Sequence, residues 1–156
     1  MPDRGWRIEA AAPQDAGSIA RLVRASLPVA LRRLTIWSSP RAGRYVHAIL
    51  CGAFPGERHQ FYLLRRGSTR AGLAAFRLFE GAAFLNHLYI APRYRGSSLG
   101  SWLLEAAARC YLARHPAPEI GLDVFARNRS ATAWYRRLGF EQRTRLGWWI
   151  SVRGVR

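Results

Sequence analysis

Lysine is absent from this chain and acidic residues are scarce. All 25 basic residues of the 156-residue sequence are arginine, against nine Asp and Glu residues, so the formal net charge at pH 7 is +16. A field of this sign attracts phosphates, acidic proteins, nucleic acids and anionic membrane surfaces. The arginines are scattered from Arg4 to Arg156 rather than gathered in one tail, and we therefore expect no specific nucleic-acid function.

Cysteine is also rare, with Cys51 and Cys110 as its two representatives. They are not in Cys-x-x-Cys spacing, and each falls in an apolar helical pattern. We expect two buried free thiols rather than a disulfide or a metal pair, and the sequence indicates no metal site.

Long apolar runs are missing too. None approaches the roughly 20 residues that a membrane-spanning helix needs, and the first ten residues, MPDRGWRIEA, lack the apolar stretch of a secretory signal. We expect a soluble, cytoplasmic protein. Hydrophobic residues make up 49% of the chain, enough to fill the core of one domain over residues 1–156.

The hydrophobic pattern alternates between strand and helix along the chain. One compact α/β domain is expected. The strands are expected at Arg7–Ala11, Phe61–Leu64, Ala71–Phe79, Ala83–Ile90, Ile120–Phe125 and Trp148–Val152; helices are expected after Pro13–Asp15, within 27–51, after Gly96 and after Asn128.

The segment Leu85–Ala108 has the layout of a phosphate cradle. An apolar strand is followed by a basic turn with glycines, and then by an amphipathic helix. The start of a helix presents unpaired backbone N–H groups and the positive end of the helix dipole, and Arg93 and Arg95 add charge beside them. Such a turn favours a pyrophosphate.

A second segment, Leu122–Phe140, again runs from strand through polar loop to helix. The pair resembles the GNAT (Gcn5-related) N-acetyltransferases. In that family Arg or Gln and spaced glycines follow a strand that ends near a proline, as at Arg95 to Gly100 here. In its next motif an Asn is followed seven residues later by a Tyr on a helix ending in Gly-Phe, as at Asn128, Tyr135 and Gly139-Phe140.

The resemblance implies an α/β (α+β) GNAT fold, in which helices flank a mixed central sheet and acyl-CoA lies in the cleft between the fourth and fifth strands. It also implies that backbone groups of Leu88, Tyr89 and Ile90 pair with the pantetheine arm and polarise the thioester carbonyl. The pyrophosphate turn would comprise six residues, and Asn128 and Tyr135 would also contact the donor. The turn residues are Arg95, Gly96, Ser97, Ser98, Leu99 and Gly100.

Ser98 departs from the family pattern, which has glycine at that position. Serine keeps the backbone N–H and adds a hydroxyl, but its Cβ crowds a close phosphate and disfavours positive φ. We expect CoA binding to be retained and weakened.

Acyl transfer from a thioester to an amine needs an acid that protonates the leaving thiolate. The resemblance assigns this role to Tyr135, and a phenol with an ordinary pKa near 10 suits a thiol near 8.5. Trp134, Tyr135 and Leu138 also form a core-like stripe, so Tyr135 as a packing residue is the alternative. Asn128 is a good helix N-cap as well as a donor contact.

The base that accepts the amine proton has two main candidates, Asp123 and His87. Relatives that acetylate ribosomal proteins carry a Glu at the position of Asp123, and the Asp here is shorter. The imidazole of His87 suits proton removal at neutral pH, and Glu80 is a third candidate. Strict strand alternation predicts Leu85, His87 and Tyr89 on one face of the sheet and Asn86 and Leu88 on the other.

The expected function is transfer of an acyl group, most simply acetyl, from acyl-CoA to a primary amine of a protein, peptide or small molecule, without a metal. The net charge disfavours small cationic acceptors and suits an acidic partner, including an acyl carrier protein as donor. The alternative is a non-catalytic GNAT-like domain that binds acyl-CoA or an anionic partner.

Overall fold

The computed structural model describes residues 5–145 of the chain. They belong to two units, Met1–Asp123 and Val124–Arg156, each described separately below. The strand expected at Trp148–Val152 lies outside the described residues. Over residues 5–145, no helix is long and apolar enough to cross a membrane.

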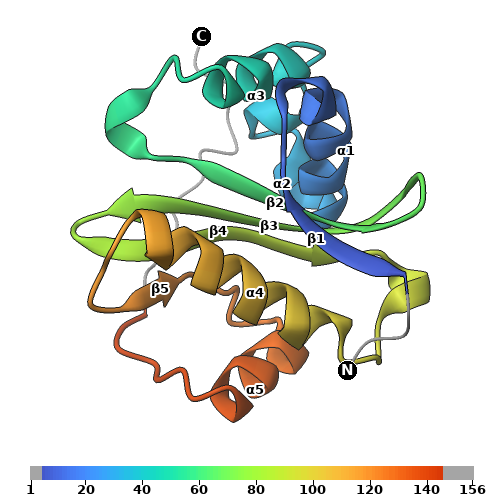
Figure 1. The fold of residues 1–156 in the computed structure, drawn as a ribbon. Helices are drawn as coiled ribbons and strands as arrows, with labels where there is room; N and C mark the ends of the chain where they lie inside the picture. Colours follow the sequence, from blue (N-terminus) through green and yellow to red (C-terminus); the bar gives the residue numbers. More distant parts are fainter. Residues whose placement is uncertain (1–4, 146–156) are drawn as a thin grey trace, which may run out of the picture. The chain divides into compact units, whose positions relative to one another are not determined.

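The first unit contains a mixed five-stranded sheet whose spatial order follows the chain (Figure 1). The first four strands are antiparallel, and the fifth pairs in parallel with the fourth. Two-residue loops close the hairpins; Glu80 and Gly81 in the second loop both have positive φ, which matches the twist of a hairpin. The strands are β1 (Trp6–Ala10), β2 (Gln60–Arg66), β3 (Thr69–Phe79), β4 (Ala82–Ile90) and β5 (Ile120–Leu122).

Helices cover both faces of this sheet (Figure 1). On one face α1 (Ala16–Ser26) and α3 (Ala42–Leu50) pack on the apolar side chains of β2 and β3, with Ile19, Val23 and Val46 fully buried. On the other face lies α4 (Leu99–Arg114), whose Tyr111 stacks on Phe76 at 5.3 Å between ring centroids. The short helix α2 (Val29–Arg32) and the 3-10 turns η1 (Pro13–Asp15), η2 (Ile36–Ser38), η3 (Pro55–Glu57) and η4 (Pro92–Tyr94) complete the unit.

The second unit contains α5 (Arg129–Arg137). Asn128 is its N-cap: the side-chain oxygen accepts a hydrogen bond from the backbone N–H of Ala131 at 3.2 Å. This cap satisfies one of the free N–H groups of the first turn. The predicted capping role of Asn128 is therefore confirmed.

Both cysteines are free thiols, but the expectation that they are buried is wrong. The buried row of α4 steps by four residues from Leu99 through Leu103 to Tyr111, and Cys110 lies beside this row, exposed to solvent. Cys51 follows the last residue of α3 at its C-terminal cap and is exposed as well. An apolar pattern marks a helix face only approximately, because the i+4 row is inclined to the helix axis.

Candidate active site

The sheet opens between β4 and β5. The two strands pair over three residues only, ending with Leu85 opposite Leu122. From Asn86 to Ile90 the outer edge of β4 has no strand partner among residues 5–145. A free strand edge presents backbone N–H and C=O groups to an extended ligand. Leu88, Tyr89 and Ile90, predicted to contact the donor, lie on this edge.

The strand predicted over Ile120–Phe125 ends at Leu122, three residues early. Asp123 follows directly and is exposed, at the point where the pairing with β4 stops. His87 lies two residues beyond Leu85 on β4, so the opening of the sheet brings the two base candidates to the same stretch of the fold. Glu80 lies in the hairpin loop before β4, at its opposite end.

A β-bulge in β4 overturns the predicted arrangement of faces. Ala75 is paired with His87 and Phe76 with Leu85, so Asn86 is an extra residue in the ladder. Neighbouring residues of β3 point to opposite faces, and their partners follow them. Leu85 therefore shares the α4 face with Phe76, whereas His87 shares the α1 face with Ala75; their predicted common face is wrong.

His87 is partly buried beside the indole ring of Trp37, with 5.4 Å between ring centroids in an edge-on arrangement. Burial, with a smaller contribution from the charge of His59, lowers the pKa of His87 to about 4. The imidazole is therefore neutral over the physiological pH range. A neutral imidazole is the form that can accept a proton, and a pKa this low makes it a weaker base than an exposed histidine.

The turn between β4 and α4 carries a series of free backbone donors. In the described part of the chain, no residue accepts from the backbone N–H groups of residues 96–101. Gly96 has a φ of +77°, which glycine adopts without strain. Ser98 has a φ of −69°, a value that any residue can adopt. The backbone strain that was expected for serine at this position is therefore absent.

Arg95 ties this turn to the end of β4. Its Nε–H donates to the carbonyl oxygen of Ile90 at 2.8 Å, and its guanidinium lies 5.6 Å from the ring centroid of Tyr89. The Ser97 hydroxyl donates to the carbonyl oxygen of Tyr94 at 2.8 Å. These contacts fix the path of the chain, so the free N–H groups have a defined arrangement.

In the second unit Tyr135 packs between Trp134 and Phe140, with ring centroids 4.8 and 5.5 Å away. Burial raises the pKa of Tyr135 to about 12. The phenol therefore stays protonated across the physiological pH range. This state is the one a proton donor to a thiolate requires.

Residues 57–142, more than half of the chain, match the acetyltransferase (GNAT) domain family. The chain belongs to this family. The predicted relationship is confirmed, and the protein is an enzyme of the acetyltransferase class. No curated protein sequence matches the chain.

Solved structures of GNAT acetyltransferases share the fold. PaiA N-acetyltransferase from Thermoplasma acidophilum in complex with coenzyme A is 19% identical with a TM-score of 0.75, over 91% of this chain and 93% of that chain. AAC(6′)-Iy with a bisubstrate analogue is 15% identical with a TM-score of 0.74, over 94% and 97%. A ribosomal-protein-alanine N-acetyltransferase from Brucella melitensis biovar Abortus 2308 is 15% identical with a TM-score of 0.66, over 94% and 98%.

This GNAT domain also contains a buried ion cluster that its sequence pattern does not predict. The carboxylate of Asp15 accepts hydrogen bonds from Arg65 Nη2 at 2.7 Å, from Arg70 Nη2 at 3.0 Å and from the backbone N–H of Ala12 at 3.1 Å. Burial alone would raise the pKa of Asp15, but these hydrogen bonds and charges hold it below its ordinary value. The sequence offers one signal for this cluster: Asp15 is one of nine acidic residues and lies where a helix is expected to begin. Its arginine partners are about 50 residues further along the chain.

Proposed function

We propose that the protein transfers an acyl group, most simply acetyl, from acyl-CoA to a primary amine by direct attack of the amine on the thioester. The observation that carries this proposal is the free edge of β4 running directly into a turn with unpaired N–H groups. Acyl-CoA has an extended pantetheine arm with a pyrophosphate at its end, and this matches a strand edge followed by a turn with free N–H groups. Family membership supports the same chemistry.

The donor would lie along β4. Backbone groups of Leu88, Tyr89 and Ile90 would bond the pantetheine arm and polarise the thioester carbonyl. The N–H groups of Gly96 through Gly100, at the positive end of the α4 dipole, would bind the pyrophosphate together with the remaining guanidinium donors of Arg95. PaiA, a structural neighbour, was crystallised with coenzyme A.

Two protons move during the transfer. As the amine nitrogen attacks the thioester carbon, its proton passes to a base, and the carbon–sulfur bond then breaks. We propose neutral His87 as this base, directly or through a water, with Asp123 as the alternative at the same opening of the sheet. The leaving thiolate takes the phenol proton of Tyr135, which burial keeps in place until that step.

The charge of the molecule bears on the acceptor and on the donor. With a net charge of +16, neutral or acidic amines are better acceptors than small polycations, whether on a protein, a peptide or a small molecule. The same charge favours an acidic acyl carrier protein as a second candidate donor. We also propose that the chain acts as one domain, in the cytoplasm.

The first experiment is a binding isotherm with acetyl-CoA, longer acyl-CoAs and free CoA, at 50 and 300 mM salt. Saturable binding that depends on acyl-chain length and survives high salt supports a thioester site. Weak binding shared by any polyanion and lost at high salt would contradict the free-CoA donor and direct the search to carrier-protein donors.

Tyr135→Phe tests whether the domain is catalytic. Loss of the phenol proton should lower kcat by about 100-fold or more while leaving the acetyl-CoA Kd unchanged, since the ring still packs. The matched control is Tyr45→Phe, which removes a phenol from α3. Equal activity of Tyr135→Phe and wild type would contradict the acid role, and turnover absent from the wild type as well would favour the non-catalytic binding domain.

A further inference from the structure

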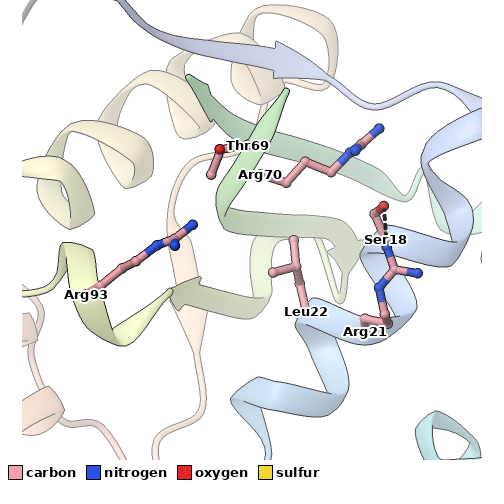
Figure 2. Close-up of a pocket in the computed structure, with 6 residues that line it drawn as sticks. All are labelled: Ser18, Arg21, Leu22, Thr69, Arg70 and Arg93. Atoms are coloured by element: carbon pink, nitrogen blue, oxygen red, sulfur yellow. Dashed lines mark hydrogen bonds between the residues drawn. The ribbon is translucent and has the colours of Figure 1, made fainter. Parts of the chain in front are cut away.

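A cavity of about 320 Å³ lies where α1, the start of β3 and η4 meet (Figure 2). It lies in the first unit, and its lining is polar and basic with a single apolar side chain, Leu22. No acidic residue lines it in the described part of the chain. The lining residues are Ser18, Arg21, Leu22, Thr69, Arg70 and Arg93.

The three arginines of this cavity are not equally compensated. Arg70 is anchored by Asp15, whose side chain is only 3% exposed, at 3.0 Å. Arg21 Nη2 donates to the Ser18 hydroxyl at 3.0 Å, and the guanidinium of Arg93 lies 4.7 Å from the Tyr94 ring centroid. Within residues 5–145, neither Arg21 nor Arg93 forms an ion pair. The cavity thus keeps at least two positive charges without a counter-ion from the described residues.

The arrangement is held by the fold rather than by one flexible segment. The arginines come from three different elements, and Asp15 restrains Arg70 through two hydrogen bonds, from its Nε and Nη2 atoms. Bringing three guanidiniums to one cavity is repulsive unless an anion neutralises them. Their planar forks match the oxygens of phosphate and carboxylate groups.

We propose that this cavity is a binding site for an oxyanion, a phosphate or carboxylate carried by a substrate. Arg21 and Arg93 would bind it directly, and the hydroxyls of Ser18 and Thr69 are further donors beside them. The cavity is larger than a bare phosphate, so there is room for part of the molecule that carries the anion. It lies on the α1 face of the sheet, the face that His87 also occupies.

Two sources of this anion are consistent with the proposed function: an acidic group of the acceptor, and the phosphate on the ribose of CoA. The shared α1 face is compatible with an acceptor group, whereas Arg93 in η4, two residues before Arg95, lies next to the turn proposed to bind the donor. This part of the inference rests on the proposed function, whereas the existence of the anion site does not.

The test is a titration with inorganic phosphate followed by NMR, using the arginine Nε–H and backbone amide signals of the wild type, at constant ionic strength set with chloride. The signals of Arg21, Arg70 and Arg93 should shift together and saturate. The amides of residues 96–100 report phosphate at the donor turn separately. Arg21→Gln and Arg93→Gln should each weaken binding at the cavity by about tenfold or more.

Arg24→Gln is the matched control, because it removes the same charge from the same helix at an exposed position that does not line the cavity. Its phosphate affinity should stay within about twofold of the wild type. An equal loss in Arg24→Gln and Arg21→Gln, or shifts that follow ionic strength alone, would overturn the proposal. Arg70 is left intact, since it also holds Asp15.

A competition with CoA and dephospho-CoA then identifies the source. If CoA displaces phosphate from the cavity and dephospho-CoA does not, the anion belongs to the donor nucleotide; if neither displaces it, the site serves the acceptor, and both outcomes support an oxyanion site. Phosphate binding at the cavity without any acyl-CoA binding would overturn the proposed function and leave this inference standing. Acyl-CoA binding with no phosphate at the cavity would overturn this inference alone.

Discussion

At the scale of single residues, backbone conformation decides which side chains fit in the turn before α4, which is proposed to bind the donor. Gly96, at a φ of +77°, lies in the region that L-residues avoid, whereas Ser98, at −69°, does not. The sequence alone predicts backbone strain at Ser98, because the GNAT pattern has glycine at this position. In the structure it is Gly96, and not Ser98, whose backbone conformation favours glycine.

This difference predicts opposite outcomes for two exchanges. Gly96→Ala should weaken CoA binding and lower the free energy of unfolding by roughly 1 kcal/mol, because a Cβ is strained at that φ. Ser98→Gly should leave the structure intact and change the CoA Kd by less than about threefold. Isothermal titration and thermal unfolding of both variants provide the check. A much lower CoA Kd for Ser98→Gly than for the wild type would show that the Cβ of Ser98 crowds the phosphate.

His87 should show an unusual pH dependence. Its pKa of about 4 in the folded protein lies below the ordinary value near 6.5, so the unfolded chain binds more protons between these values. The free energy of unfolding should therefore fall as the pH is lowered from about 6.5 to about 4, by at most about 1.4 kcal/mol per pH unit. The slope should be smaller than this limit because solvent reaches part of the side chain.

We predict that His87→Gln flattens this part of the stability profile and lowers kcat without shifting the acetyl-CoA Kd. NMR titration of the His87 ring and urea unfolding from pH 4.5 to 7.5 measure the two effects. Asp123→Asn is the comparison variant for the base. A His87 ring that titrates near 6.5 would contradict the burial of its imidazole, and full activity of His87→Gln would remove His87 from the proposed mechanism.

At the scale of elements, the Asp15 cluster joins the start of α1 to β2 and β3. One buried carboxylate serves a backbone N–H and two arginines that come from neighbouring strands. Arg65 bridges further to Glu9 on β1 at 3.1 Å. A single side chain thus ties the start of α1 to two strands of the sheet.

Asp15→Asn should lower the free energy of unfolding by about 3 kcal/mol at pH 7, since it leaves two guanidiniums without their buried partner. Glu9→Gln, at a side chain that is 46% exposed, should cost less than about 1 kcal/mol. Because the folded pKa of Asp15 is lowered, the difference between wild type and Asp15→Asn should be complete above about pH 4 and shrink as pH falls below it. Equal losses in the two variants, measured by urea unfolding, would contradict the cluster's structural role.

At the scale of the whole molecule, charge is the dominant feature. A net charge of +16 produces a long-range field that acts on every ligand before contact. Several structural neighbours act on aminoglycosides according to their names, but at 14–15% identity they establish the fold alone.

We therefore predict that kcat/KM for acidic acceptors falls several-fold between 50 and 300 mM salt, whereas kcat/KM for neutral amines stays nearly constant and polycationic amines are poor substrates at either salt concentration. A panel of three amines matched in size and differing in charge, assayed by thiol release, measures this. Efficient acetylation of the polycation at low salt would show that local carboxylates override the net field.

The sequence by itself determined the family, the order of the elements within residues 5–145 and the position of the turn proposed to bind the donor, because these depend on local periodicity and on spacings of a few residues. Leu88 through Gly100 form the predicted strand edge and turn, and Asn128 caps its helix as expected. The tertiary structure alone decided which faces the side chains occupy. The bulge at Asn86 reversed Leu85 relative to His87, Cys110 lay outside the buried row of α4, and long-range folding brought Arg21, Arg70 and Arg93 to one cavity. Strand register, the choice of the buried helix face and ion pairing across 50 residues depend on contacts between distant segments, which no local pattern encodes.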